Sequence, residues 1–297
     1  MNCITNWGFC EFAEINIDTG LKMERRAERK TAVKGRLHRL AESVLSLGIP
    51  AVGYLAGGGD AHMKALVYVP GVLLAAAHIL SVNDAAFGRE TSLSNLLADR
   101  KNIIFTLFLP LTLIPYSFIN LPFTLLIFLT ALNWDVYSVK GKRFWLAGLM
   151  HNAAGGALHF MLGLAAAADS AGLFGRTCSP PAEIAYFALL MTAGAMHHDA
   201  FDAEEDRAAG YITGAVRFGS DLWWRLAVIP FLVGTAALFG AEEMFRSSFI
   251  LPSAAYFALY LIFSLSGKPA GRPVFRVFCR IIFVLGAVIY IIRKVSG

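Results

Sequence analysis

Five acidic side chains lie close together between His197 and Thr213, directly after the apolar run Ile184–Met196. They are Asp199, Asp202, Glu204, Glu205 and Asp206. On an α-helix the three aspartates have the spacing i, i+3 and i+7, so their carboxylates share one face. Like charges this close repel each other, and a membrane edge raises the cost. A divalent cation such as Mg²⁺ would relieve the repulsion, because it binds carboxylate oxygens and bridges to phosphates. The alternative is a solvated acidic turn that caps a helix.

The composition indicates what kind of protein holds these carboxylates. Hydrophobic residues make up 57% of the chain, charged residues only 16%, and the mean hydropathy is +0.58, which excludes an ordinary soluble domain. Apolar runs long enough to cross a bilayer recur along most of the length. We therefore predict an all-α, polytopic membrane protein, a bundle of nine transmembrane helices near residues 40–58, 64–83, 102–116, 119–136, 145–166, 183–200, 222–240, 247–266 and 274–293.

The basic residues predict the orientation of this bundle. With the N-terminus in the cytoplasm, all but five of the 26 Lys and Arg residues fall in cytoplasmic segments. This bias obeys the positive-inside rule and would be lost if one span were miscounted. It places the N-terminus and the acidic residues on the cytoplasmic side, which is the inner membrane if the organism is bacterial. The net charge of +5 then reflects topology and makes no case for nucleic acid.

The ends of the predicted domain follow from composition as well. Residues 1–21 lack a basic stretch followed by an apolar core, so they do not form a signal peptide. We expect a basic, disordered extension over 1–35 and the nine-helix domain over 36–297. Pro115, Asn120 and Pro122 interrupt the apolar stretch 103–134 and predict a tight hairpin between the third and fourth spans.

A second polar cluster follows the second span. Asn83 and Asp84 stand at its cytoplasmic end, as Asp202 and Asp206 stand at the end of the sixth. If the two helices are neighbours, the two clusters would form one pocket. Taken alone, an Asn-Asp pair after a helix is also an ordinary turn signal.

Two further groups of side chains lie near the same membrane face. Lys142 and Arg143 follow the fourth span; they are typical topology determinants, but they could also bind a diphosphate. The fifth span carries a stripe of small and polar residues, for which we favour close helix packing. If the stripe lines a cavity, two of its members, Asn152 and His159, would contact a substrate; the others are Gly155, Gly156 and Gly163.

Together these motifs resemble the UbiA superfamily of intramembrane prenyltransferases. The stretch Asp202-Ala-Glu-Glu-Asp206-Arg207-Ala-Ala-Gly210-Tyr-Ile-Thr213 is similar to that family's DxxxD loop and its GxxT tail. Asn83-Asp84 resembles the start of the family's first motif, and Tyr137-Ser138 followed by Arg143 resembles its element after span four. The resemblance covers roughly residues 36–295.

The first motif departs from the family pattern NDxxDxxxD. Phe87 stands where the second acid is expected and Thr91 where the third is, although Glu90 or Asp99 could supply a carboxylate. In the second motif Phe201 replaces the frequent Arg before the first aspartate. These changes indicate a divergent member rather than a mainstream ubiquinone or menaquinone enzyme.

The resemblance implies an integral membrane prenyltransferase that uses Mg²⁺. It would transfer a prenyl group from an allylic prenyl diphosphate to a small lipophilic acceptor, an aromatic or quinone-precursor ring, with membrane lipids around it. The implied catalytic residues are Asp84, Asp202 and Asp206. The implied metal ligands are Asn83, Asp84, Asp202 and Asp206, with Asp199 and then Glu90 as further candidates. The implied substrate-binding residues are Asn83, Arg89, Lys142, Arg143, Asn152 and Arg207.

Two other functions fit the same residues. A relative that kept the fold and lost its first metal cluster would bind prenyl lipids without catalysis, which the substitution at Phe87 favours. A transporter could use intramembrane acids to carry a cation. Against the transporter, the acids gather at one membrane face, and the sequence shows no inverted repeat.

Overall fold

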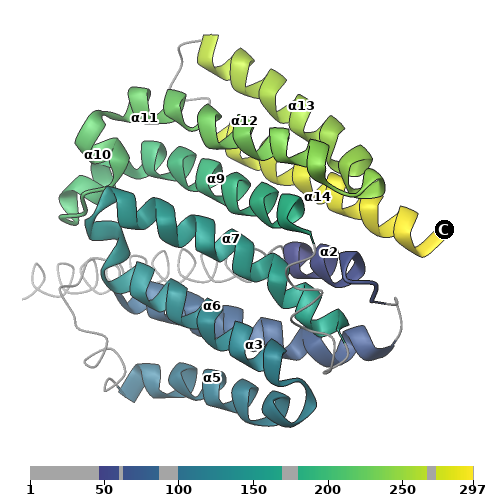
Figure 1. Cartoon of the computed structure of the whole chain (residues 1–297). Coiled ribbons are helices and arrows are strands. Elements are labelled where there is room, and N and C mark those ends of the chain that lie inside the picture. Colours follow the sequence, from purple (N-terminus) through teal and green to yellow (C-terminus); the bar gives the residue numbers. More distant parts are fainter. Residues whose placement is uncertain (1–46, 60–62, 87–99, 169–179, 266–271, 297) are drawn as a thin grey trace, which may run out of the picture. The chain divides into compact units, whose positions relative to one another are not determined.

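All elements of the described structure are helices. The computed structural model describes residues 47–59, 63–86, 100–168, 180–265 and 272–296, all within one compact unit, Leu45–Gly297 (Figure 1). No strand occurs among these residues, so the predicted all-α class is confirmed. The predicted boundary between the extension 1–35 and the helical domain falls outside the described ranges and stays a prediction.

The order of the helices follows the apolar runs of the sequence. Each predicted span has at least one helix at its place, and α11 and α12 share the seventh. The bounds are α2 Gly48–Ala56, α3 Met63–Ala86, α5 Arg100–Ile119, α6 Leu121–Val139, α7 Trp145–Ala167, α9 Pro181–Ala208, α10 Gly214–Phe218, α11 Ser220–Leu226, α12 Val228–Ala237, α13 Glu243–Leu265 and α14 Arg272–Ser296, with short 3₁₀ helices η1 Gly141–Arg143 and η2 Leu238–Gly240.

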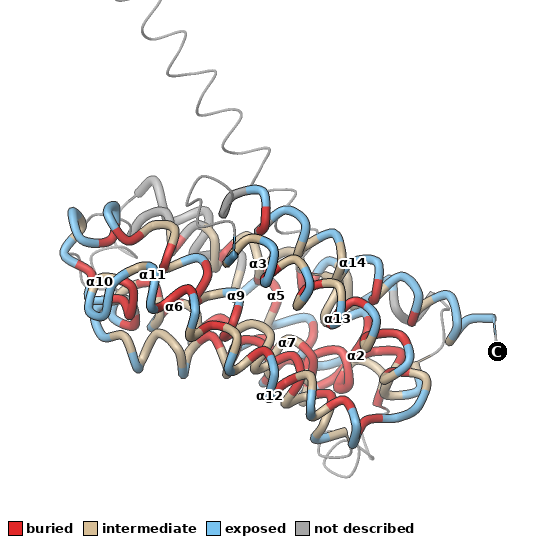
Figure 2. Tube along the Cα trace, turned by 90° about the horizontal axis from the view of Figure 1, so that it is seen from above, coloured by how far each residue is buried: buried red, intermediate tan, exposed pale blue. Residues whose placement is uncertain are grey.

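Three helical segments are long and apolar enough to cross a membrane by themselves. They are Leu121–Val139, Ser220–Gly240 and Glu243–Leu265, and shorter apolar stretches occupy Leu66–Leu80 and Leu109–Ile119. The outer faces agree with this. Exposed positions recur along the helices (Figure 2), and many of them carry large apolar side chains. Water would penalise such stripes, whereas lipid covers them. The protein is therefore an integral membrane protein, and the number of nine spans stays a prediction. The stripe on α6 is Leu121, Leu125, Phe128, Leu132 and Val136.

Helix α7 packs mainly against α2, α6 and α9. Glycines let two of them approach closely. A Cβ atom on Gly163 would lie 2.0 Å from the Pro50 carbonyl oxygen of α2. One on Gly156 would lie 2.3 Å from the Phe187 carbonyl oxygen of α9. The small residues of the fifth span therefore serve close helix packing, as the sequence favoured.

The predicted hairpin between α5 and α6 is confirmed, with one correction. Asn120 alone separates the two helices, and its Oδ1 caps α6 by accepting the Phe123 N–H at 3.0 Å. Its Nδ2 donates to the Ala165 carbonyl at 2.8 Å, which ties the hairpin to α7. Pro115, however, lies inside α5 rather than in the hairpin. The next residue, Tyr116, hydrogen-bonds the α3 backbone through its hydroxyl group.

A buried histidine holds α9 against the C-terminal helices. His197 Nε2 lies 2.5 Å from the Tyr256 hydroxyl of α13. Its ring also packs on Trp224 of α11 at 4.3 Å and on Phe275 of α14 at 5.0 Å between centroids. Because His197 immediately precedes the acidic stretch, this packing sets the position of the carboxylates that follow.

Candidate functional site

The second acidic motif lies on the last turns of α9, which runs unbroken to Ala208. The helix therefore places Asp199, Asp202 and Asp206 on one face, as their spacing predicted. Asp206 is buried at 7% exposure, and the other two are half-buried. Asp202 Oδ2 lies 2.7 Å from Nδ1 of His198, one turn earlier on the helix. Three like charges on one face of a helix end, one of them buried, favour a cationic partner.

Gly210 ends α9 in a Schellman motif. It adopts a φ of +76°, which a residue without a Cβ atom reaches at no steric cost. The N–H of Tyr211 donates to the Asp206 carbonyl at 2.8 Å, and the N–H of Gly210 donates to Arg207 at 3.1 Å. The chain then turns back, so that Tyr211 and Thr213 are buried beside the aspartates' helix. The hydroxyl oxygen of Thr213 has no hydrogen-bond partner among the described residues.

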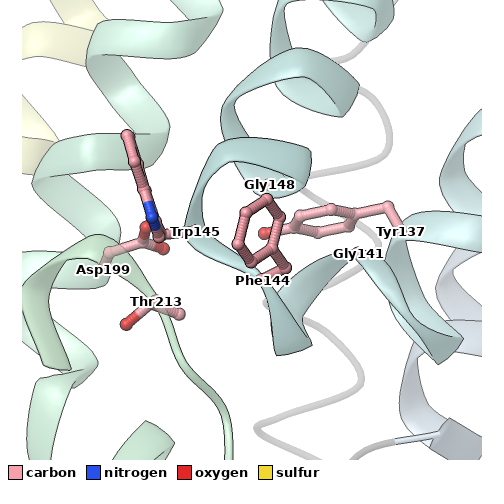
Figure 3. A pocket seen from close by; sticks show the side chains of 7 residues that line it. All are labelled: Tyr137, Gly141, Phe144, Trp145, Gly148, Asp199 and Thr213. Carbon is pink, nitrogen blue, oxygen red and sulfur yellow. The ribbon is translucent and has the colours of Figure 1, made fainter. Parts of the chain in front are cut away.

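A small pocket opens in front of this turn (Figure 3). Asp199 and Thr213 line one side of it, and Tyr137 at the end of α6 lines another. The Tyr137 hydroxyl hydrogen-bonds the side chain of Asn152 on α7, and all three aspartates lie near enough to interact with it electrostatically. The structure thus brings together α6, α7 and α9 around Asp199. The remaining lining residues are Gly141, Phe144, Trp145 and Gly148.

The first acidic motif lies at the end of α3, and its described contact is with α6. Asn83 stands in the last turn of α3, where its Oδ1 accepts the Ser138 hydroxyl of α6 at 3.3 Å. Asp84 belongs to the same turn, but its side chain is not described. Arg89, Glu90 and Asp99, named from the sequence as further candidates, lie outside the described residues together with Phe87 and Thr91.

The end of α6 connects the two motifs. Helix α3 packs on α5 and α6, whereas α9 packs on α7, α12, α10 and α11, so α6 and α7 lie between the helices that carry the acids (Figure 1). Two consecutive residues of α6 face the two sides: Ser138 contacts Asn83 of the first motif, and Tyr137 faces Asp199 of the second. The two motifs therefore meet the same helix end instead of packing on each other.

The basic and polar residues predicted to bind substrate are partly exposed and partly buried at the site. Arg207 is exposed and pairs with Glu204 at 2.6 Å, rather than with the aspartates. Arg143 is exposed at the end of η1, and the side chain of Lys142 is not described. Asn152 is buried and reaches Tyr137, whereas His159 hydrogen-bonds the Gly155 carbonyl of its own helix at 2.6 Å. Of the two stripe residues named for substrate contact, only Asn152 thus joins the site.

Sequence reasoning missed several residues of the pocket. Phe144, Trp145 and Thr213 line it, yet the sequence named none of them as candidates for the site. Trp145 is held by edge-on contacts with Phe218 and Trp223, at 5.2 and 5.9 Å between centroids. Only Thr213 had a signal, its place in the GxxT tail. Trp145 lies at the pocket where the start of α7 meets α10 and α11, and Phe144 precedes it as the N-cap residue of α7.

Comparison with known proteins identifies the fold. No protein-family model and no curated protein matches the sequence. Solved structures do match: a UbiA homologue from Aeropyrum pernix K1 superposes with a TM-score of 0.65 at 14% identity, covering 86% of this chain and 98% of that one. A UbiA homologue from Archaeoglobus fulgidus gives 0.63 at 17% identity, covering 88% and 99%.

A third structure, of a digeranylgeranylglyceryl phosphate synthase, also gives a TM-score of 0.63, at 15% identity, and covers 86% of this chain and 94% of that one. All three similarities extend over almost the whole of the known chains. At such low identity they establish the fold. The chain has the fold of the UbiA homologues, the superfamily that its acidic motifs resemble.

Proposed function

We propose that this protein is a divergent UbiA-type prenyltransferase. It transfers a prenyl group from an allylic prenyl diphosphate to a small lipophilic acceptor, for which the motifs favour an aromatic or quinone-precursor ring. The observation that carries the proposal is the end of α6, where Ser138 contacts the first acidic motif and Tyr137 faces the second. The A. fulgidus homologue, which has the same fold, has been solved with DMAPP and Mg²⁺ and with GPP and Mg²⁺.

The donor atoms of α9 suit Mg²⁺, which prefers carboxylate oxygens. Asp199, Asp202 and Asp206 would supply them, and Asn83 with Asp84 would complete the set from α3. Among the described residues no three His, Cys, Asp or Glu side chains are grouped around one point, which supports a site that draws its ligands from both motifs. When bound, the metal would neutralise the diphosphate and make it a better leaving group.

The chain's other residues have proposed roles around the diphosphate. Arg89, Lys142, Arg143 and Arg207 are the cationic side chains that would stabilise charge on the leaving oxygens. Asn152, held by Tyr137, would orient the substrate. The prenyl tail would lie along the apolar surfaces between the helices, where scarce water protects an allylic cation. We place this site on the cytoplasmic side of the membrane, following the distribution of Lys and Arg.

Label transfer tests the proposal. Purified protein in detergent is supplied with tritium-labelled geranyl, farnesyl or geranylgeranyl diphosphate and a lipid extract of the host membranes. Transfer of label to an extract lipid in the presence of Mg²⁺ is expected, and EDTA should abolish it. Tight donor binding without transfer for any donor would instead indicate a catalytically degenerate relative. Mg²⁺-driven ion flux in liposomes, with no transfer, would indicate a transporter.

Replacing His198 with alanine tests whether Asp202 binds the metal ion. The His198 imidazole lies 2.7 Å from Asp202 Oδ2 and is itself nearly half exposed, at 47%. We expect a metal ion at this oxygen to displace the imidazole, so that the two compete. Because a net hydrogen bond is worth about 1 kcal/mol, His198→Ala should lower the Mg²⁺ concentration for half-maximal donor binding about two- to fivefold. A Mg²⁺ titration of donor binding measures this. A higher requirement would mean that His198 orients Asp202 for the metal instead.

A further inference from the structure

A buried pair of ionisable side chains joins α3 to α6, outside all the residues that the sequence named for the site. His78 Nε2 lies 3.0 Å from Asp135 Oδ2, and the two side chains are only 3% and 10% exposed. Both belong to predicted spans, where ionisable groups are costly and usually serve a function. The other carboxylate oxygen, Asp135 Oδ1, is buried and has no hydrogen-bond partner among the described residues.

Packing of α3 on α6 accounts for one carboxylate oxygen of Asp135 and not for the other. One turn further along α6, Ser138 and Asn83 already join the same two helices with uncharged groups. A bond between His78 and Asp135 accounts for Oδ2 but leaves Oδ1 buried without a donor, and buried polar atoms rarely lack one. A carboxylate oxygen can only accept, so its missing partner is a proton donor or a cation. A metal ion needs several ligands, and no three suitable groups are clustered among the described residues.

Asp135 lies at the distance from the proposed diphosphate site at which a hydroxyl group of the acceptor would react. Asp135 precedes Ser138 by three residues of α6, or about 4.5 Å along the helix axis. Ser138 contacts the first acidic motif, where the diphosphate of the proposed donor would bind. In a displacement the nucleophile approaches C1 from the side opposite the leaving oxygen, at a separation of about 3–3.5 Å. A group that handles the nucleophile's proton therefore belongs about one helical turn from the metal ligands, which is the position of Asp135.

We propose that Asp135 is a catalytic residue that accepts the proton of an acceptor hydroxyl group at Oδ1. As the hydroxyl oxygen bonds to C1 of the prenyl group, the bond from C1 to the diphosphate oxygen breaks, and its electron pair leaves with the diphosphate. His78 is a positioning residue, because its Nε2 holds Oδ2 and so aims Oδ1. The inference rests on the proposed prenyl transfer. It assigns the reacting atom of the lipophilic acceptor, a hydroxyl oxygen of a phenol or of an alcohol in place of the favoured ring, so that the product is an ether.

Asp135→Asn tests this pair, because the amide keeps the shape but cannot accept the proton. Three quantities are measured: Mg²⁺-dependent binding of labelled geranyl diphosphate, slow release of diphosphate without acceptor, and label transfer to a host lipid extract. We expect transfer to fall about 100-fold or more, a typical loss for a general base, while the two donor readouts change less than about threefold. Asp135→Glu should regain about tenfold of the lost transfer, since it restores a carboxylate.

A control on the same helix separates catalysis from packing. Thr130→Val changes another buried polar side chain of α6. Its hydroxyl group bonds only its own helix among the described residues, so the variant should leave all three quantities unchanged. If Asp135→Asn does not fold, His78→Gln takes its place. The Gln amide still donates to Oδ2 but aims the carboxylate less firmly, so transfer should fall about tenfold with donor binding unchanged.

Several outcomes would overturn the inference. One is undiminished transfer by Asp135→Asn. Another is a loss of donor binding and diphosphate release as large as the loss of transfer, which would make the pair structural. A product joined through carbon rather than an ether oxygen would also refute it, and mass spectrometry of the labelled lipid distinguishes these products and tells a phenol from an alcohol. Each of these leaves the proposed function standing. Absence of Mg²⁺-dependent donor binding in the unmodified protein would overturn both.

Discussion

Replacing Asp206 with asparagine is expected to lower Mg²⁺-dependent prenyl transfer about 100-fold or more, a loss of about 2.7 kcal/mol of transition-state stabilisation. Asp206 is the most buried of the three aspartates on its face of α9, at 7% exposure. Its carbonyl also accepts the Tyr211 N–H of the Schellman turn, and asparagine preserves that backbone bond. The substitution therefore removes one negative charge without changing the helix end. Label transfer and donor binding at several Mg²⁺ concentrations measure the loss.

The neighbouring residue supplies the control. Glu205→Gln removes the same charge from the same helix, but Glu205 is exposed and lies off the aspartate face. It should change transfer less than about twofold, because surface charges interact weakly. Asp202→Ala and Asp206→Ala should both weaken donor binding more than Glu90→Ala, since the first motif has lost acids at Phe87 and Thr91. Equal losses in the three variants would refute this division of the metal site between the motifs.

Replacing Gly163 with alanine should destabilise the protein by about 3 kcal/mol or more, the upper range for overpacking a well-packed interior. The added Cβ atom would lie 2.0 Å from the Pro50 carbonyl oxygen and 2.5 Å from the Tyr54 backbone nitrogen. Both are backbone atoms of α2, so no side-chain rotation can relieve the clash, and the two helices must separate. Thermal unfolding in detergent, followed by helical circular dichroism, should show a lower midpoint.

Gly194 on α9 offers a matched control for this clash. A Cβ atom there would meet nothing within 4 Å, and the position is exposed. Gly194→Ala should therefore raise stability by about 0.5–1 kcal/mol, because alanine loses less backbone freedom than glycine in a helix. If the two variants unfold at the same temperature, close packing of α2 on α7 is not what Gly163 provides.

The local features of this protein were readable from the sequence. The apolar runs predicted the long described helices but not the short α10 and η1, since hydrophobic length determines where a lipid-embedded helix can form. The i, i+3, i+7 spacing placed Asp199, Asp202 and Asp206 on one face, and the structure has that face. Asn120 was a hairpin signal and proved to be the cap of α6. Pro115 was misleading, because proline is tolerated inside membrane helices whose neighbours satisfy the freed backbone groups.

Only the tertiary structure showed which distant residues meet. His78 and Asp135 are 57 residues apart, and Asn83 and Ser138 are 55 apart; neither pairing has any signature in hydrophobic periodicity. Trp145 lies at the pocket where it contacts Phe218 of α10 and Trp223 of α11, more than 70 residues further along the chain. In a membrane, apolar faces contact lipid and protein equally well, so an apolar stripe does not reveal which neighbour it meets.

The sequence by itself determined the elements and the chemistry of this protein: lipid-embedded helices and a carboxylate face at the end of one of them. Those follow from spacing along a single helix, whose geometry is the same in every protein. The tertiary structure decided the rest, namely that α6 lies between the two acidic motifs and that a buried His–Asp pair lies one turn from the first. These depend on which helices approach closely, and that is decided by glycine contacts and polar pairs between segments far apart in the chain.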